Sequence, residues 1–303
     1  MWVLRGLRHG VLTTRWPARP DQYAQDSRGP AVVAARQPAD ADRLPGLCPT
    51  GAIAAAGGSV SLDQGRCIQC GRCVRARPEV FAWSAGPASA ALIRPGLIVP
   101  DLAGLPGLPE SPESLAAVSE QLRARTRALR RSVHLRHVDA GSDGTEEWEI
   151  LALLNPVYDV HRLGIFLTAS PRHADVLLVT GAGARGMTEP LRRAYEAMPH
   201  PKIVIAVGTD AVGGGLISPS YATTAGVAAT VPVDVWVPGS PPTPFAILYA
   251  LLLALGRLPG ADPAGRDAAA PARPAPGPPG PDAAAPGPPP PGPSAPSAAG
   301  AQR

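Results

Sequence analysis

The feature that most limits the possible folds is an alternation, from Ser132 onward, between short apolar runs and amphipathic segments. The apolar runs predict strands at residues 133–138, 174–180, 202–207 and 233–237. The segments between and after them predict helices at residues 146–154, 188–198 and 243–255. Strands that alternate with helices indicate a parallel sheet with helices on both faces.

The remaining sequence predicts four further segments. The first twenty residues carry four arginines and no acid, which favours a membrane-surface or partner-docking extension, with a transit peptide as the alternative. The Pro- and Gly-rich stretch after the cysteines reads as a linker that leads into a short helix, and the Ala/Pro/Gly tail is typical of disorder. The predicted segments are a docking extension at 1–37, a cysteine-bearing domain at 38–85, a linker and helix at 86–131, the α/β domain at 132–258 and a disordered tail at 259–303.

The bulk properties exclude two classes of protein. A net charge of +4 and a pI near 9.1 are too mild to argue for nucleic acid as a partner. The longest apolar run, residues 245–255, is shorter than the ~18–20 residues that a membrane-spanning helix needs. We therefore expect this run to form a buried helix.

All four cysteines lie in one short stretch, at Cys48, Cys67, Cys70 and Cys73. Disulfides between residues this close in sequence would be strained, and they need an oxidising compartment. Ligation of a metal or a cluster in a reducing cytosol fits the pattern better.

The cysteine stretch resembles a bacterial two-cluster ferredoxin, in which each C-x2-C-x2-C-x3-C-P run lends its last cysteine to the other run's cluster. Here the second run ends in Arg77-Pro78 where the family has Cys-Pro, whereas Cys48-Pro49 ends the first run. Counting back from Cys48 by the same spacing gives three residues that cannot be ligands, namely Pro38, Ala41 and Leu44.

The losses therefore fall on one cluster only. The resemblance implies a small α+β ferredoxin-like domain that holds one [4Fe–4S] cluster through Cys48, Cys67, Cys70 and Cys73. A zinc site and a decayed remnant are the alternatives. Zinc sites usually show cysteines in pairs, and decay would scatter its losses over both clusters.

The α/β segment resembles the small subunit that complex I shares with the membrane-bound energy-converting hydrogenases. The resemblance covers nearly all of this domain and rests on five stretches of sequence, at residues 131–142, 155–165, 168–181, 189–208 and 231–244. It implies a flavodoxin-like, doubly wound parallel sheet whose cluster loops lie beyond the strand ends.

The resemblance also identifies positions where the family's cluster-binding cysteines are missing. The family motif Ala-Gly-Ser-Cys-Asn-Gly-Cys-Glu reads AGSDGTEE at residues 140–147, and the other two loops read VGTD at 207–210 and PGSPPTP at 238–244. The four degenerate positions are Asp143, Glu146, Asp210 and Ser240. We expect no cluster there. The acids could pair with arginines or solvent, bind Mg²⁺ or Mn²⁺, or relay protons.

These resemblances imply an electron-transfer and docking subunit of a complex I-like or hydrogenase-like complex, with one cluster and no complete active site of its own. The implied partners are a large subunit of the 49 kDa or hydrogenase type, membrane antiporter-like subunits and a soluble electron donor. The implied location is cytoplasmic, on the inner face of the cell membrane. A purely structural subunit and an oxygen-ligated divalent-metal site are the alternative functions.

Overall fold

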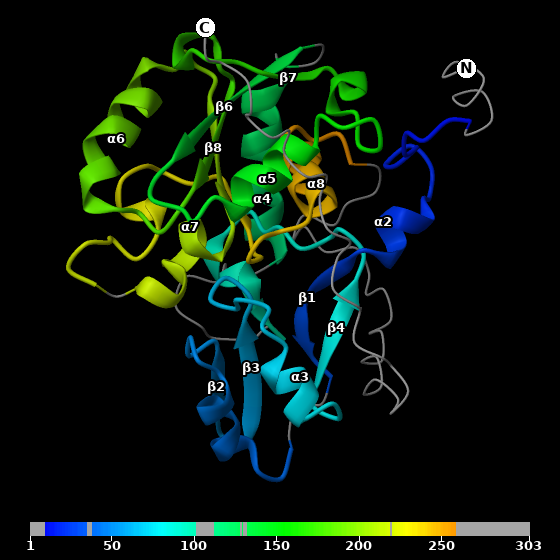
Figure 1. Cartoon of the computed structure of the whole chain (residues 1–303), viewed down its shortest axis with the longest axis vertical. Coiled ribbons are helices and arrows are strands. Elements are labelled where there is room, and N and C mark those ends of the chain that lie inside the picture. Colours follow the sequence, from blue (N-terminus) through cyan, green and yellow to red (C-terminus); the bar gives the residue numbers. More distant parts are fainter. Residues whose placement is uncertain are drawn as a thin grey trace, which may run out of the picture.

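The computed structural model describes residues 10–34, 38–100, 112–127, 129, 132–218 and 220–258. Its larger part is a five-stranded parallel sheet with the order β10-β9-β8-β6-β7 (Figure 1). The strands are β6 (Val133–Asp139), β7 (Ile165–Leu167), β8 (Val176–Thr180), β9 (Ile203–Val207) and β10 (Val235–Val237). Numbered along the chain this order is 5-4-3-1-2, which is the flavodoxin-like winding. The predicted fold class is confirmed.

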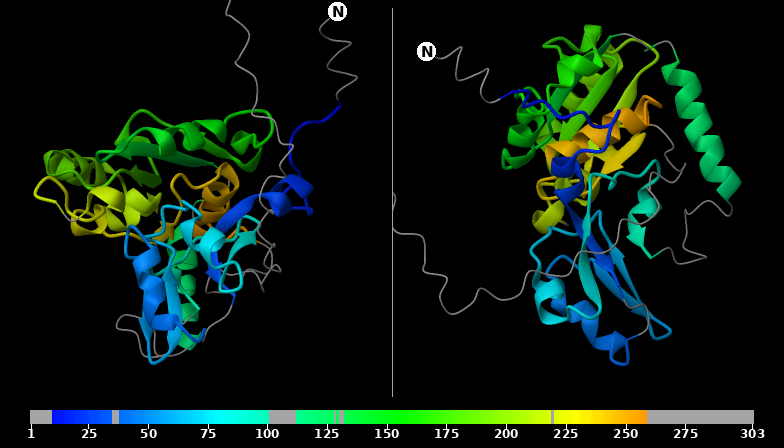
Figure 2. Two further views of the ribbon diagram at one scale, coloured as in Figure 1. Left: turned by 60° about the horizontal axis from the view of Figure 1, so that its bottom comes forward. Right: turned by 90° about the vertical axis from the view of Figure 1, so that its right-hand side faces the viewer.

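Helices cover both faces of this sheet (Figure 2). Alternate residues of β8 belong to different cores, since Val176 and Leu178 pack on one side and Leu177 and Val179 on the other. The first core includes side chains of α4, α5 and α8, and the second includes side chains of α6 and α7. The helices are α4 (Pro112–Thr126), α5 (Thr145–Ala152), α6 (Thr188–Ala197), α7 (Thr209–Gly213) and α8 (Pro244–Ala254).

Helix α8 is buried along its whole length. A helix that is apolar all round has no face suited to water, so it becomes the centre of a core. Its start is fixed by Pro244 in the first turn and by Thr243, whose hydroxyl accepts a hydrogen bond from the Ala246 amide at 3.3 Å. Within the described residues, no helix has the length and hydrophobicity to cross a membrane.

The cysteine-bearing segment forms the narrow lower part of Figure 1. It contains an antiparallel pair, β1 with β4, and a three-stranded antiparallel sheet of order β2-β3-β5. These elements enclose a third, smaller core that includes Cys67 and Cys73. The elements are β1 (Arg28–Val33), β2 (Ile53–Ala56), β3 (Ser59–Asp63), α3 (Arg72–Ala76), β4 (Phe81–Ala85) and β5 (Ile98–Val99).

Part of the predicted docking extension packs on this chain itself. Strand β1 pairs with β4, which joins the extension to the cysteine-bearing segment. Before it, the Thr14 amide donates to the Val157 carbonyl at 2.8 Å, and Trp16 meets Phe245 of α8 edge to face with ring centroids 6.1 Å apart. The short helix α2 (Gln22–Asp26) links these contacts to β1. The first nine residues, residues 101–111 of the Pro- and Gly-rich linker and the predicted disordered tail lie outside the described residues.

Short 3-10 helices complete the connections. They are η1 (Ala41–Leu47), η2 (Arg94–Leu97), η3 (Val160–Leu163), η4 (Pro171–His173), η5 (Arg185–Met187), η6 (Gly215–Ile217) and η7 (Val227–Ala229).

Candidate functional site

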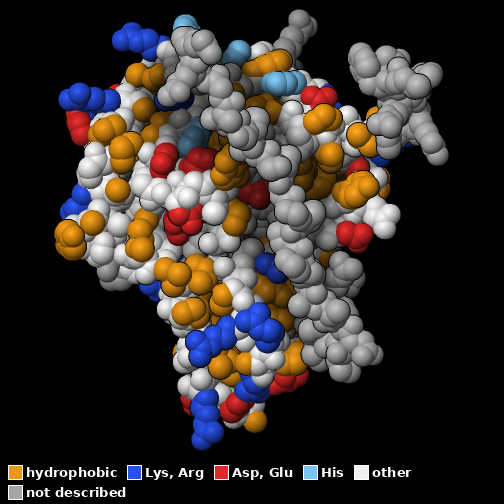
Figure 3. Space-filling view, viewed as in Figure 1, with side chains coloured by type: hydrophobic (Ala, Val, Ile, Leu, Met, Phe, Trp, Pro, Cys, Tyr) orange, Lys and Arg blue, Asp and Glu red, His pale blue; other side chains and the backbone are white. Residues whose placement is uncertain are grey.

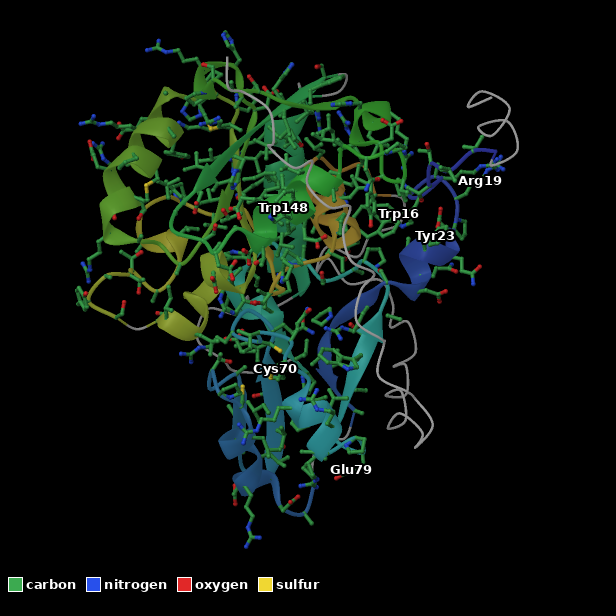
Figure 4. The ribbon with its side chains drawn as sticks, in the orientation of Figure 1. Trp16, Arg19, Tyr23, Cys70, Glu79 and Trp148 are labelled. Carbon is green, nitrogen blue, oxygen red and sulfur yellow. The ribbon has the colours of Figure 1, made fainter. Side chains whose placement is uncertain are left out.

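The four cysteines line one pocket, which we call the cysteine pocket. Cys48 follows η1, Cys67 and Cys70 lie in the loop before α3, and Cys73 lies in α3 itself. Cys67 and Cys73 are buried, whereas Cys70 is exposed and is labelled in Figure 4. The rest of the lining is mostly apolar and includes Ala31, Leu47, Leu62, Ile68 and Trp83. The sequence-predicted ligands thus come together around a space with one exposed side.

The loop that carries Cys70 has a backbone that few residues tolerate. Gln69 has φ 53° and Gly71 has φ 72°, both in the left-handed region. A Cβ at Gly71 would also lie 2.9 Å from Arg75 Nη1 and 3.1 Å from the Trp83 ring. Glycine is therefore needed for the turn that leads from Cys70 into α3 and places Cys73 beside it.

Hydrogen bonds fix the Cys48 loop against the other cysteines. The Ala52 amide donates to Cys48 Sγ at 3.2 Å, and the Thr50 hydroxyl lies 3.4 Å from the same sulfur. That hydroxyl also donates to the Arg66 carbonyl at 2.6 Å, next to Cys67. Burial tends to raise the pKa of the Cys48 thiol, but these hydrogen bonds hold that pKa below its usual value.

The pKa values of the two buried thiols, Cys67 and Cys73, are raised instead. Burial raises the pKa of Cys67 to about 12, and the neighbouring cysteines add to this because like charges repel. Burial also raises the pKa of Cys73, again with a contribution from Cys70 and Cys48. Gathered thiolates in this pocket therefore need positive charge between them.

The spacing of these groups bears on the zinc alternative. Within the described residues, no group of three or more His, Cys, Asp or Glu side chains could hold a single metal ion. Four thiolates at ~2.3 Å from one zinc ion would stand about 3.8 Å apart. The pocket cysteines do not form such a group, so the structure by itself shows neither a zinc site nor a cluster site. A cubane is wider than one ion and takes thiolates that stand farther apart.

Other side chains stand at the four positions where a two-cluster ferredoxin has the ligands of its second cluster, namely Pro38, Ala41, Leu44 and Arg77. Arg77 forms ion pairs with Asp40 and with Glu79, and its Nη2 lies 2.9 Å from Asp40 Oδ1. Ala41 and Leu44 are buried in the small core, at 3% and 2% exposure. An ion pair and apolar side chains thus occupy the region where a second cluster would sit.

The degenerate positions of the α/β domain follow β6, β9 and β10: Asp143 and Ser240 lie in loops, Glu146 lies in the first turn of α5, and Asp210 lies in the first turn of α7. We call Asp143, Glu146, Asp210 and Ser240, with their loops, the carboxylate loops. Asp143 accepts hydrogen bonds from the Thr145 amide at 3.0 Å and the Thr145 hydroxyl at 2.6 Å, which lower its pKa. The charge of Asp143 acts on both Glu146 and Asp210, so the three acids are neighbours.

Glu146 is the most unusual of these acids because it is only 1% exposed. Burial raises the pKa of Glu146 to about 7, and the charges of Asp210 and Asp143 raise it further. The carboxylate lies against Gly208, where a Cβ would stand 2.5 Å from Glu146 Oε1. Gly208 therefore leaves space for this side chain.

Asp210 lies at the start of α7, and burial followed by the charge of Asp143 raises its pKa. A Cβ at Gly215 would collide with its Oδ1. Ser240 lies close to the start of α7, because the carbonyl of its neighbour Gly239 accepts a hydrogen bond from the Thr209 amide at 2.6 Å. The structure thus brings the three loops together, yet it forms no group among the described residues that could hold a metal ion. The oxygen-ligated metal alternative gains no support.

One buried hydrogen bond connects the cysteine pocket to the carboxylate loops. The Thr209 hydroxyl donates to the Cys67 carbonyl at 3.0 Å, and it accepts from the Gly239 amide at 3.3 Å. Glycines bring the same two segments close, since a Cβ at Gly213 would lie 3.1 Å from the Gly65 carbonyl. The Cys67 backbone therefore contacts the α/β domain, whereas Cys70 is exposed to solvent.

A second polar cluster next to Glu146 was missed at the sequence level. Glu147 accepts from the Ser142 hydroxyl at 3.0 Å, forms a short hydrogen bond with Thr180, and lies 3.3 Å from His137 Nε2. Burial lowers the pKa of His137 even though Glu147 opposes this. The available signal was that Glu147 matches the last residue of the family motif quoted above.

Comparisons with known proteins assign the α/β domain to a family. The family model for the NADH ubiquinone oxidoreductase 20 Kd subunit matches residues 144–254. "Probable membrane-bound hydrogenase subunit mbhJ" of Pyrococcus furiosus is 47% identical over 128 residues, which is 42% of this chain and 77% of that protein. This chain belongs to the 20 kDa subunit family.

A second relative matches this chain over a longer stretch. "Formate hydrogenlyase subunit 7" of Escherichia coli strain K12 is 42% identical over 158 residues, which is 52% of this chain. The chain spans 61% of that protein. A chain from a structure of the membrane-bound sulfane sulfur reductase, an archaeal respiratory membrane complex, matches 45% of this chain and 77% of its own length. Its identity is 29% and its TM-score is 0.39.

Proposed function

We propose that this chain is a one-cluster electron-transfer and docking subunit of a complex I-like or hydrogenase-like complex. The cysteine pocket would hold one [4Fe–4S] cluster through Cys48, Cys67, Cys70 and Cys73, and the carboxylate loops would hold none. The observation that carries this proposal is the shared pocket of all four cysteines, which joins two segments that are distant in sequence. The bound cluster would supply one-electron transfer.

The residues around the pocket fit a cubane. Thiolates are the soft, charged donors that surround such clusters. The apolar lining excludes water from the buried side, and the Ala52 amide that donates to Cys48 Sγ stabilises a thiolate at that position. The raised pKa values of Cys67 and Cys73 mean that these thiolates are stable only beside a cation.

The positions of the cysteines define a direction for the electron. Cys70 is exposed and offers the side at which a donor can approach. Cys67 is buried and contacts Thr209 of the α/β domain, so this side leads toward the partner subunit. Because the carboxylate loops lack thiolates, the electron would leave the pocket directly for a centre in the partner and would not pass through a terminal cluster in this chain.

The proposed partners are a large subunit of the 49 kDa or hydrogenase type, membrane antiporter-like subunits and a soluble electron donor. The proposed location is the inner face of the cell membrane. An exposed apolar stripe supports docking by the α/β domain. Helix α5, directly after the first carboxylate loop, exposes 74% of Trp148 and 50% of Leu151 (Figure 4), and such residues are enriched in protein interfaces.

The test is iron and sulfide analysis of anaerobically purified protein, with low-temperature EPR after reduction with dithionite. One cluster, and therefore about four iron atoms per chain, is the expected result. The Cys70→Ala variant should lose this signal, whereas Asp143→Ala should keep it. Two clusters would contradict our account of the carboxylate loops, and zinc without iron would contradict the cluster itself.

A purely structural role is the second candidate, and one observation favours it. All four degenerate positions carry oxygen side chains, yet the loops remain tightly hydrogen-bonded through Thr145, Thr209 and Glu147. A scaffold would need only this packing. Protein that assembles with its partners but contains no iron would favour the scaffold over the electron-transfer subunit.

A further inference from the structure

Three arginines surround the exposed side of the cysteine pocket, and we call Arg28, Arg72 and Arg75 the arginine rim. All three are exposed. Arg72 lines the pocket directly. Figure 3 shows arginine side chains (blue) on the narrow lower part of the molecule, on the same face on which Figure 4 labels Cys70.

Contacts hold two of these arginines at the pocket mouth. Arg75 Nη1 donates to the Cys70 carbonyl at 3.1 Å. The Arg28 guanidinium lies 4.3 Å from the centroid of the Trp83 ring, and Trp83 itself lines the pocket. A cation stacked on an aromatic ring keeps its charge but loses part of its freedom. The positive charge is thus fixed beside Cys70.

No acid of the described chain neutralises the rim, since the ion pairs found in the structure do not include Arg28, Arg72 or Arg75. Three acids of the cysteine-bearing segment are paired with other arginines. Asp40 and Glu79 pair with Arg77, and Asp63 pairs with Arg94 at 2.8 Å. Charges that are left unpaired around one exposed redox side chain attract negative surfaces and orient them.

We propose that the arginine rim is the docking surface for an acidic electron-carrier protein, which places its own redox centre opposite Cys70. This inference rests on the proposed function because it needs a cluster in the cysteine pocket. Electrostatic complementarity of this kind mainly raises the association rate and fixes the orientation of the partner. Contacts beyond the rim would then need to supply little affinity, which suits a carrier that must leave after each electron.

An anionic lipid surface is the competing partner for the same charges. A membrane would satisfy the arginines, but it would bring no electron carrier to Cys70 and would cover the one exposed thiol of the pocket. The exposed position of Cys70 at the centre of the rim therefore favours a protein.

The test is stopped-flow electron exchange with an acidic plant-type [2Fe–2S] ferredoxin as the probe, run in whichever direction is thermodynamically downhill. We expect the second-order rate constant to fall about tenfold or more as salt rises from ~0.02 M to ~0.3 M, because screening shortens the reach of exposed charges. In Arg72→Gln/Arg75→Gln the rate at low salt should fall about tenfold and depend less on salt.

Three controls make the test decisive. Arg172→Gln/Arg185→Gln removes the same charge from the α/β domain and should leave the rate unchanged. Arg28→Gln changes the rim without touching the cysteine loop and should lower the rate in the same direction. Reduction by methyl viologen radical cation, which is not attracted by arginines, should not slow in the rim variants.

The outcomes separate the two proposals. Absence of iron and sulfide, together with absence of an EPR signal after reduction with dithionite, would overturn the proposed function itself. A normal cluster whose exchange rate is insensitive to salt, or is equal in rim and control variants, would overturn the docking inference alone. If the rim variants lose binding to phosphatidylglycerol vesicles but keep the wild-type exchange rate, the rim is a lipid-binding surface and the inference is wrong.

Discussion

The cysteine pocket and the carboxylate loops are neighbours with opposite donor chemistry. Both are built from loops that glycines bring close together, and the Thr209 hydroxyl connects them through the Cys67 carbonyl. One offers four sulfur atoms in an apolar surrounding, and the other offers carboxylates that hydrogen-bond to their own loops. The comparison teaches that the fold of the α/β domain does not need thiolate ligands in order to hold these loops in place.

The two places that lack ligands are filled by different means. In the cysteine-bearing segment, buried Ala41 and Leu44 and the Arg77–Asp40 ion pair take the space. In the α/β domain, Glu146 and Asp210 lie against Gly208 and Gly215. The first place belongs to a small core and takes apolar side chains. The second lies beyond the strand ends, where polar groups find loop amides and hydroxyls.

We expect the largest effect from removing one thiol of the cysteine pocket. Cys67→Ala removes a buried thiol of the cysteine pocket, and we expect the protein to lose essentially all of its iron and sulfide. Asp210→Ala, a short distance away, should change neither. Metal analysis of the two variants side by side checks this, and equal iron contents would contradict it.

The next largest effect should come from giving the carboxylate loops the thiols that the cysteine pocket has. The variant Asp143→Cys/Glu146→Cys/Asp210→Cys/Ser240→Cys restores thiols at the four degenerate positions. Because the loops already meet, reconstitution should raise the iron content from about four to about eight atoms per chain. The control is Asp143→Cys/Glu146→Cys, which supplies too few thiols. An unchanged iron content in the fourfold variant would show that the loops are not arranged for a cluster.

Leu44→Ala tests the apolar filling of the cysteine-bearing segment. Leu44 is 2% exposed, so truncation should reduce the free energy of unfolding by about 2–4 kcal/mol. Leu12→Ala is the control, since Leu12 is 60% exposed and its loss should cost less than about 0.5 kcal/mol. Urea unfolding of the holoprotein measures both. A small effect at Leu44 would mean that its core is loosely packed.

Glu146→Gln tests the buried acid of the carboxylate loops through the pH dependence of the free energy of unfolding. Burial raises the pKa of Glu146 from 4.5 to about 7, so the folded state favours the protonated form. The stabilisation from this group is complete below pH 4.5 and is lost as the pH rises through 7. At pH 8 the Gln variant should therefore unfold with a free energy higher than wild type by on the order of 2 kcal/mol.

The Gln variant should also lose the decline in stability between pH 4.5 and pH 7. Denaturant titrations at a series of pH values measure this, with the exposed Glu120→Gln as the control. A wild-type profile that is flat over this range would contradict the raised pKa of Glu146.

The smallest effect concerns the bond between the two regions. Thr209→Val removes the hydroxyl that bridges the Cys67 carbonyl and the Gly239 amide. We expect a loss of about 1 kcal/mol in unfolding free energy, with the iron content unchanged. Thr13→Val, which removes the hydroxyl bond to the Pro156 carbonyl at an exposed site, is the matched control. An iron loss in Thr209→Val would show that the bridge is needed to hold the cluster.

The sequence predicted the sheet well because its central strands are continuous apolar runs, which only a doubly covered sheet explains. It missed β7, whose three residues are too few for a pattern and include two that are more than a third exposed, Phe166 and Leu167. It also missed the pairing of β1 with β4, because long-range antiparallel pairing leaves little local signal.

For the candidate site, cysteine spacing and the family motifs identified both sets of positions. They could not show that Thr209 contacts Cys67, since these residues are 142 positions apart. Nor could they show that Glu146 is buried rather than solvated, because burial depends on the packing of Gly208 against it. The network of Glu147 with His137 and Thr180 was hidden for the same reason.

Native mass spectrometry of the anaerobically purified chain tests the central claim most directly, because it counts clusters on each molecule. We predict one population whose excess mass equals a single [4Fe–4S] cluster in wild type and in Asp210→Ala, and none in Cys67→Ala. A wild-type mass that corresponds to two clusters, or a single cluster that survives in Cys67→Ala but disappears in Asp210→Ala, would contradict the account.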